Sequence, residues 1–271
     1  MKADLHMHST ASDGRLSPEG VIILANKAGL DMVSLTDHDT VSGLPVARKT
    51  AFSFGMRFLA GCEVSAKVVD TEVHLLSYGF DAENEALASF LLKQQERRTD
   101  RAAEFVERLK KSGDLPGSAK LPVPVAGKSI ARPHIAKMLI DARSATDFAD
   151  AFKRFLIPGS KHFVPKPLPE GQDVVDVVHA AGGVVVLAHP GHQTPHAVVL
   201  QLIKAGLDGV EVIHPSHDMS LNTYYRNLAA QYSLMVTGGS DFHGQPKHGG
   251  LSLGDYWINP GPEILKMART Q

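Results

Sequence analysis

The chain has 271 residues, of which 43% are apolar and 21% are charged, and its formal net charge is −1. This length accommodates one large domain or two small ones, and the composition is that of an ordinary globular protein. A nearly neutral chain has no global attraction to nucleic acid or to membranes, so any phosphate recognition must be local. Without a basic flank before an apolar N-terminal stretch, or an apolar run of about 18 residues, we expect a cytoplasmic protein.

Fourteen histidines accompany a single cysteine, Cys62. A lone cysteine excludes a disulfide within the chain. If the protein binds metal, imidazole and carboxylate groups are therefore the expected ligands, and thiolate is not.

The first 82 residues alternate short apolar runs with helical patterns. An extended segment at Lys2–Leu5 leads into His6 and His8, which point to the same side because they are two residues apart. Both imidazoles can thus approach one point, as a metal site requires. The expected elements that follow are a helix capped by Ser17 and ending near Gly29, a strand at 32–35, a helix at 41–54, a strand at 57–60, and a strand at 72–78 paired with 63–68 through a turn at Asp70.

The middle of the chain, residues 83–157, has no strand pattern. A long helix is expected over 83–112 with Gly113 as its C-cap, and the Pro- and Gly-rich stretch 114–128 is expected to be a loop. Two shorter helices are expected at about 132–140 and 145–156. We predict that 83–157 is a helical insertion contributing to the substrate site, between the two parts of a barrel domain, 1–82 and 158–271.

Alternation returns after a Pro-rich link at 158–169. The expected elements are helices at 171–181, 195–205 and 220–231, each followed by a strand, at 183–187, 209–213 and 234–237. About seven strands alternating with helices favour a parallel, barrel-like α/β fold over an open sheet.

Polar residues follow the predicted strands closely. In a parallel barrel the carboxyl ends of the strands meet at one face, where catalytic residues gather. Six histidines and several carboxylates would converge there, which suits two or three divalent ions better than one tetrahedral ion. The residues are His6, His8, Asp13, Asp37, His38, Glu63, His74, His189, Asp241 and His243.

Successive motifs resemble, in order, those of the PHP (polymerase and histidinol phosphatase) superfamily. They are Asp4-Leu5-His6-Met7-His8-Ser9, Thr36-Asp37-His38-Asp39, Gly61-Cys62-Glu63, His74, Leu187-Ala188-His189-Pro190 and Gly239-Ser240-Asp241-Phe242-His243. The resemblance covers essentially the whole chain. It implies a distorted (β/α)7 barrel with a trinuclear metal centre, in which a metal-bridging hydroxide attacks the phosphorus of a phosphoester.

The resemblance also implies which residues bind each ion. His6, His8, Glu63 and Asp241 would bind the first, Glu63, His74 and His189 the second, and Asp13, His38 and His243 the third. Asp37 and Asp39 would orient His38 or the neighbouring loops. Mn²⁺ is favoured by the carboxylate content, and Fe²⁺ or Zn²⁺ would also suit mixed imidazole and carboxylate sites.

Three further stretches resemble the branch of 5′→3′ exoribonucleases and nucleotide 3′,5′-bisphosphate phosphatases. They are the run from Ser129 to Ala136, Val164-Pro165 and Ala181-Gly182-Gly183. A second substrate phosphate would need its own cations and donors, for which Lys128, Ser129, Arg132, His134 and Lys161 are candidates. The Arg97, Arg98 and Arg101 cluster is expected to be a solvated helix face, although it could touch an RNA tail.

The predicted reaction removes the 3′-phosphate of a nucleotide 3′,5′-bisphosphate, or nucleotides from the 5′ end of short RNA. Either His192 or His217 could protonate the leaving group, and the sequence does not choose between them. The alternatives are a histidinol-phosphate phosphatase and, from another class, a non-catalytic metal-binding accessory module. We expect neither a membrane nor a stable protein partner, and a monomer is weakly favoured.

Overall fold

The computed structural model describes residues 1–121, 129–244 and 253–268. Within these residues, seven strands form one sheet in the order of the chain. The strands are β1 (Ala3–Asp4), β2 (Met32–Leu35), β3 (Arg57–Val68), β4 (Thr71–Tyr78), β5 (Val184–Leu187), β6 (Gly209–Ile213) and β7 (Met235–Gly238).

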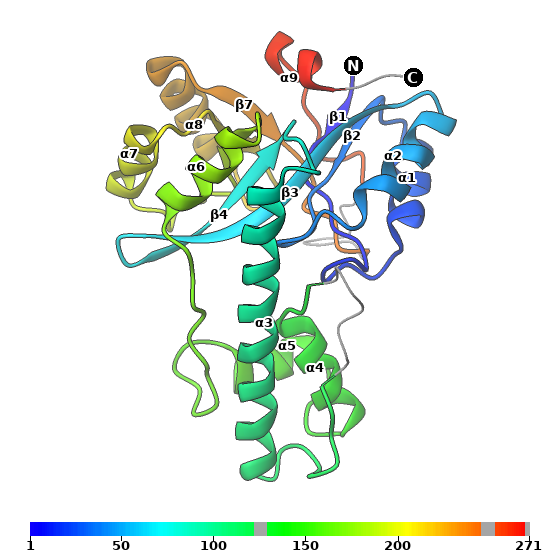
Figure 1. Cartoon of the computed structure of the whole chain (residues 1–271), viewed down its shortest axis with the longest axis vertical. Helices are drawn as coiled ribbons and strands as arrows, with labels where there is room; N and C mark the ends of the chain where they lie inside the picture. The colour runs from blue at the N-terminus through cyan, green and yellow to red at the C-terminus, as the bar shows by residue number, and fades with distance from the viewer. Residues whose placement is uncertain (122–128, 245–252, 269–271) are drawn as a thin grey trace.

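The sheet curls into a nearly closed barrel with one seam, between β1 and β7 (Figure 1). Backbone hydrogen bonds cross the seam from Leu5 N to Gly238 O at 3.1 Å and from His8 N to Phe242 O at 2.8 Å. The expected distorted (β/α)7 barrel with a helical insertion is therefore confirmed.

The expected pairing of 63–68 with 72–78 through a turn at Asp70 is confirmed, and it makes the sheet mixed, not wholly parallel. β4 runs antiparallel to both of its neighbours, β3 and β5, whereas the other pairs are parallel. The turn at Val69 and Asp70 is too short for the crossover that a parallel neighbour needs, so β3 and β4 form a hairpin. The two segments expected at 57–60 and 63–68 are one continuous strand.

Helices cover the barrel and form the insertion. They are α1 (Pro18–Lys27), α2 (Leu44–Ser53), α3 (Glu85–Lys111), α4 (Arg132–Asp141), α5 (Phe148–Ala151), the π-helical turn η1 (Phe152–Leu156), α6 (Gly171–Ala180), α7 (His196–Ala205), α8 (Met219–Tyr232) and α9 (Pro262–Met267). Ser17 caps α1 as expected, because its Oγ accepts a hydrogen bond from Gly20 N at 3.1 Å. The helix expected at 145–156 is instead the short α5 followed by η1, and α9 was not expected.

Two separate apolar cores hold the barrel. Side chains of alternate strand residues fill its interior, including Leu5, Met32 and Leu76, and Ile264 of α9 joins them. A larger core lies between the outer faces of the strands and the covering helices. Among the described helices, none is both long and apolar enough to cross a membrane.

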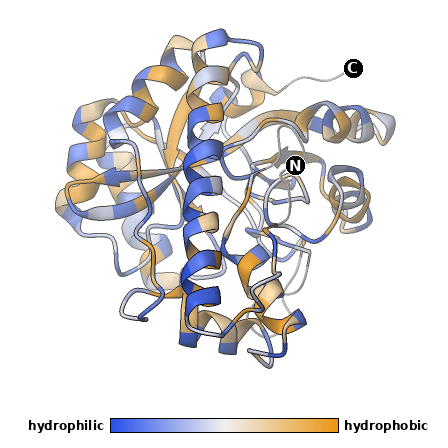
Figure 2. Cartoon of the chain, turned by 60° about the horizontal axis from the view of Figure 1, so that its bottom comes forward, coloured by the Kyte–Doolittle hydropathy of each residue, from blue (hydrophilic) through white to orange (hydrophobic). Residues whose placement is uncertain are grey.

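The insertion has an apolar core of its own, extending from Ala102 to Val164. α3 joins the two parts, since Leu87 and Leu91 pack in the barrel core and Phe105 and Leu109 in that of the insertion. Its 27 residues span about 40 Å. Figure 1 shows α4 and α5 beyond the end of the barrel opposite α9, and Figure 2 shows that α3 turns a largely hydrophilic face outward. The exact domain boundaries stay a prediction.

Candidate metal centre

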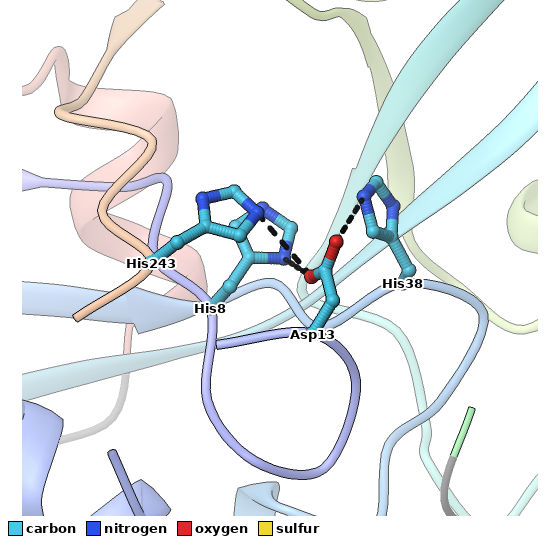
Figure 3. A group of neighbouring side chains, drawn as sticks. All are labelled: His8, Asp13, His38 and His243. Carbon is cyan, nitrogen blue, oxygen red and sulfur yellow. Dashed lines mark ion pairs between the residues drawn. The ribbon is translucent and has the colours of Figure 1, made fainter. Parts of the chain in front are cut away.

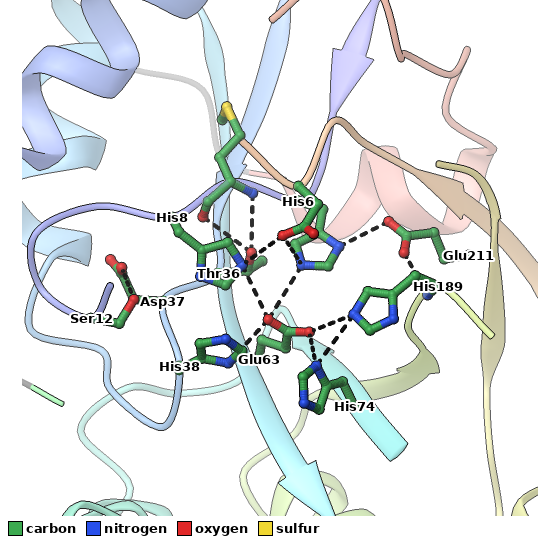
Figure 4. Close-up of polar contacts among 12 residues, drawn as sticks. His6, His8, Ser12, Thr36, Asp37, His38, Glu63, His74, His189 and Glu211 are labelled. Carbon is green, nitrogen blue, oxygen red and sulfur yellow. Dashed lines mark hydrogen bonds and ion pairs between the residues drawn. The ribbon is translucent and has the colours of Figure 1, made fainter. Parts of the chain in front are cut away.

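The nine expected ligands gather at the barrel end that faces the insertion, although they come from six strands and the loops beside them. Figure 4 shows how His6, His8, His38, His74 and His189 surround Glu63. His6 and His8 follow β1, His38 follows β2 and His189 follows β5, while Glu63 and His74 lie on β3 and β4. Because β4 runs antiparallel to its neighbours, His74 can join the group from the first half of the strand. Asp241 and His243 follow β7, and Asp13 lies in the loop after β1.

Glu63 lies at the centre of the group, with a different set of imidazoles at each oxygen. Its Oε1 is 2.8 Å from His74 Nδ1 and 3.0 Å from His189 Nε2. Its Oε2 is 3.1 Å from both His8 Nε2 and His38 Nδ1. This carboxylate can therefore bridge two ions, the role that the resemblance to the PHP superfamily implied for it.

A second carboxylate, Asp13, lies among the imidazoles of His8, His38 and His243 (Figure 3). Its Oδ1 is 3.2 Å from His243 Nε2 and 3.8 Å from His8 Nδ1. Its Oδ2 is 3.8 Å from His38 Nε2. His8 thus faces Asp13 with one ring nitrogen and Glu63 with the other.

The third carboxylate, Asp241, completes the environment of the first two histidines. Its Oδ1 is 3.5 Å from His6 Nε2 and 3.3 Å from His8 Nε2. Asp241 has a φ of 49°, in the left-handed region that residues with a side chain seldom occupy. Such a conformation at a site residue is consistent with a functional constraint on its backbone.

The donor set fits divalent cations. His6 Nε2, His8 Nε2 and His38 Nδ1 are buried and have no hydrogen-bond partner in the protein. Buried polar atoms are rarely left without a partner, and here their ring nitrogens converge on carboxylate oxygens. Four groups of three or four side chains, each with its ligand atoms within 4.8 Å, together include all nine expected residues.

The charge state of the carboxylates also suits metal binding. Burial by itself would raise the pKa of Glu63, but His38 and His74 outweigh it and hold that pKa well below its usual range. Burial likewise opposes ionisation of Asp13, whose pKa is held well below its usual range by His38 and His243. Both groups are therefore ionised ligands in the neutral pH range.

Asp37 organises the loop that carries Asp13. Its Oδ1 accepts hydrogen bonds from Ser9 N at 2.7 Å and from Ser12 Oγ at 2.6 Å. Its Oδ2 accepts one from Ser9 Oγ at 2.7 Å. Asp37 thus shapes a neighbouring loop, one of the two roles expected for it.

Two residues beside the nine were missed from the sequence. Glu211 is fully buried in β6, and its Oε1 lies 3.0 Å from His6 Nδ1. His214 accepts a hydrogen bond from Ser216 N at Nδ1, while its Nε2 lies 3.5 Å from Asp241 Oδ2. For Glu211 the sequence did offer a signal, because it is the one charged residue in the apolar run Gly209–Ile213. An ionised group in a buried strand requires a partner, so this glutamate could have been expected to contact a polar site.

The structure separates the two histidines proposed as the general acid. His217 is buried, its Nδ1 donates to Val212 O at 2.9 Å, and its Nε2 accepts from Gly191 N at 3.0 Å. The neutral ring thus donates its one proton to a backbone carbonyl and has none to give to a substrate. We therefore correct the expectation that His217 could protonate the leaving group. The His192 side chain is 67% exposed, 3.6 Å from Asp218 Oδ2, and stays a candidate.

Of the expected substrate-binding residues that the structure describes, Arg132 and His134 lie in the first turn of α4, Ser129 precedes it and Lys161 follows it. Ser129 is buried and its N donates to Ala11 O at 2.9 Å, which places it beside the loop of Asp13. The His134 ring caps α4, accepting at Nδ1 from Ala131 N at 3.1 Å. Lys161 is exposed, and Lys128 lies outside the described residues.

Arg132 lines a small cleft together with Arg98 and Arg101 of α3. Arg101 Nε donates a hydrogen bond to Val164 O at 2.9 Å. Burial is the main cause that lowers the pKa of Arg101 to about 10, and the nearby charge of Arg132 is the second. Three guanidinium groups around one cleft are a suitable environment for an anion.

The expectation that Arg98 belongs to a solvated face is wrong. Arg98 is buried, forms a short ion pair with Asp39 and donates to Ser65 Oγ at 3.1 Å. It links α3 of the insertion to the loop of His38. Lys166, which lines a second cleft beside Arg98, was also missed and pairs with Glu72 at 3.0 Å.

Comparisons with known proteins agree with this geometry. The model of the PHP domain family matches residues 4–157. The 5′-3′ exoribonuclease Rnm of Escherichia coli is 34% identical, over 89% of this chain and 84% of its own length. The 3′,5′-nucleoside bisphosphate phosphatase of Chromobacterium violaceum is 33% identical, over 93% of this chain and 90% of its own.

A solved structure shares the whole architecture. The crystal structure of a metal-dependent phosphoesterase from Bifidobacterium adolescentis superimposes with a TM-score of 0.85 at 32% sequence identity. The match covers 97% of this chain and 94% of the other. The similarity thus extends over the barrel and the insertion together.

Proposed function

The chain belongs to the PHP domain family and is a metal-dependent phosphoesterase, and from this premise we propose that its substrate carries a second phosphate. The substrate is a nucleotide 3′,5′-bisphosphate, from which the 3′-phosphate is removed, or a short RNA shortened from its 5′ end. The observation that carries this proposal is the cleft of Arg98, Arg101 and Arg132 beside the metal centre.

Three ions would be held by the nine converging side chains. His6, His8, Glu63 and Asp241 would bind the first, Glu63, His74 and His189 the second, and Asp13, His38 and His243 the third. When bound, such ions would supply an activated water near neutral pH and positive charge for the phosphoryl oxygens. We favour Mn²⁺ because of the carboxylates, with Fe²⁺ or Zn²⁺ as alternatives.

The protein's own groups position the substrate. Glu63 and Asp13, kept ionised by the surrounding imidazoles, fix the spacing of the site. Arg132 and Arg101 present planar guanidinium groups to the second phosphate, which they can bind in a bidentate way. Ser129 Oγ, buried without a partner beside the Asp13 loop, adds a hydroxyl donor.

One binding geometry serves both proposed substrates. A nucleoside 3′,5′-bisphosphate and the first nucleotide of a 5′-phosphorylated RNA both carry a 5′-phosphate and a 3′-phosphoester on the same ribose. If the arginine cleft binds the 5′-phosphate, the 3′-phosphoester is placed at the metal centre in each case. The relatives named for an exoribonuclease and for a bisphosphate phosphatase support this shared geometry.

A substrate panel tests the proposal. Metal-loaded protein is given adenosine 3′,5′-bisphosphate, adenosine 3′-monophosphate, 5′-phosphorylated oligoribonucleotides of increasing length, and histidinol phosphate. We expect the highest kcat/KM for the bisphosphate or the oligonucleotides. Preference for histidinol phosphate would support the alternative phosphatase, and no turnover of any compound by metal-loaded protein would support a non-catalytic module.

A further inference from the structure

β6 differs from the other strands of the barrel. It and the loop after it contribute none of the nine proposed ligands, whereas each of the other six strands carries or leads into at least one. Yet β6 carries Glu211, a carboxylate with no exposed surface, in an otherwise apolar strand. An ionised group buried in this way requires partners that compensate for its lost hydration.

Both oxygens of Glu211 contact residues of the metal centre (Figure 4). Oε1 lies 3.0 Å from His6 Nδ1. Oε2 accepts a hydrogen bond from the backbone N–H of His189 at 2.7 Å. One side chain therefore contacts two proposed ligands, which follow two different strands, β1 and β5.

The contact with His6 determines where the imidazole carries its proton. A carboxylate only accepts hydrogen bonds, so the proton must lie on Nδ1. When the imidazole is neutral, as a metal ligand must be, Nε2 then carries the lone pair, and it lies 3.4 Å from Glu63 Oε2 and 3.5 Å from Asp241 Oδ1. This is the tautomer in which Nε2 can bind a cation.

The contact with His189 acts on the backbone. His189 has a φ of 26°, within the left-handed region, where a residue with a side chain is strained. The hydrogen bond from its N–H to Glu211 helps to hold this conformation. In it, the ring reaches Glu63 Oε1 with Nε2 at 3.0 Å.

We propose that Glu211 is a positioning residue, which fixes the tautomer of His6 and the backbone of His189 and so prepares both for metal. This inference rests on the proposed ligand assignment. It makes β6 a supporting strand, whose side chain acts on the ligands of two ions without binding either.

Glu211→Gln is the decisive variant. The site presents two N–H donors, and glutamine offers one acceptor and one donor in place of two acceptors. Either the His189 hydrogen bond is lost or the proton of His6 must move to Nε2. We expect Mn²⁺ binding to weaken by about 10- to 100-fold, the usual effect of losing such a partner.

Three measurements define the result. Mn²⁺ affinity is measured by chelator competition, and thermal unfolding of the metal-free protein is followed by circular dichroism. The His6 tautomer is read from ¹⁵N chemical shifts of the Zn²⁺-loaded protein, in which the ring is neutral. Thr237→Val is the matched control, because Thr237 pairs with Glu211 across β6 and β7, is buried, and has an Oγ1 without a partner. We expect it to bind Mn²⁺ like the wild type.

Equal Mn²⁺ affinity of Glu211→Gln and the wild type would overturn the inference while leaving the proposed function intact. A wild type that binds no Mn²⁺, Fe²⁺ or Zn²⁺ would instead overturn the ligand assignment, and this inference with it. If Glu211→Gln does not fold, the wild-type tautomer decides: a proton on Nδ1 of His6 supports the inference, and a proton on Nε2 contradicts it.

Discussion

The metal centre and the arginine cleft lie side by side but are built in different ways. The centre collects its side chains from six strands and the loops that adjoin them, through short local motifs of the sequence. The cleft is formed where α3 and α4 pack together, and Arg98 reaches it from the apolar stripe of α3. In the proposed function, the chemistry thus belongs to the barrel, and recognition of the second phosphate belongs to the contact between α3 and α4. Variants in the two regions should differ accordingly.

The largest effect is expected at the centre of the metal site. Glu63→Gln keeps the shape of the side chain but removes the charge that four imidazoles face at 3.1 Å or less. We expect kcat to fall by about 10³-fold or more, since metal and carboxylate together contribute several kcal/mol. Phosphate release is the assay. Glu170→Gln, an exposed carboxylate paired with Lys67, should retain wild-type turnover.

The second-largest effect is expected on the free energy of unfolding, at the ion pair between Arg98 of the cleft and Asp39 beside the metal centre. Arg98→Ala leaves Asp39 buried without its cation, which should cost about 3 kcal/mol of unfolding free energy. Urea denaturation of the metal-free protein measures this loss. Adding Asp39→Asn to the variant should restore part of the stability. An unchanged denaturation midpoint for Arg98→Ala would show that the ion pair does not join the regions.

A smaller effect, specific to one substrate, is expected in the cleft. Arg132→Ala should lower kcat/KM for adenosine 3′,5′-bisphosphate by about 10- to 100-fold, the value of one or two charged hydrogen bonds. Turnover of adenosine 3′-monophosphate should change little. Lys137→Ala, an exposed cation of the same helix that pairs with Asp141, is the control. Equal losses on both substrates would place Arg132 outside second-phosphate binding.

The smallest effect is expected at the start of α1, which belongs to neither region. Ser17→Ala removes the hydrogen bond from Gly20 N at the start of α1 and should cost about 1 kcal/mol of stability. Thermal unfolding measures the change. Since α1 contributes none of the nine proposed ligands, kcat/KM of the folded variant should equal that of the wild type. A loss of activity would show that the stability of α1 affects the geometry of the metal centre.

The sequence predicted the barrel and the residues of the centre better than the cleft, for physical reasons. His6 and His8 are two residues apart after a strand, so their shared direction follows from backbone geometry alone. The turn at Asp70 likewise predicted the hairpin of β3 and β4, whereas the antiparallel pairing of β4 with β5 joins segments far apart in the sequence and follows from no local pattern. Arg98 was missed although it continues the buried helical stripe of Leu87, Leu91 and Ala102, since a charge on such a stripe is usually assumed to be solvated.

The remaining omissions depend on contacts between distant parts of the chain. Glu211 acquires its role from His6, 205 positions earlier, and no local pattern records that contact. Lys166 lies in a Pro-rich link that has no periodicity, and only folding brings it to Glu72. Local motifs therefore identify side chains that could bind an ion, whereas the groups that orient them or select a substrate require the tertiary structure.

Anomalous diffraction from crystals of the Mn²⁺-loaded protein tests the central claim most directly. We predict three peaks, one within bonding distance of each proposed ligand group, with Glu63 shared between two of them. The absence of peaks among these nine side chains, or peaks bound by other residues, would contradict the proposed metal centre.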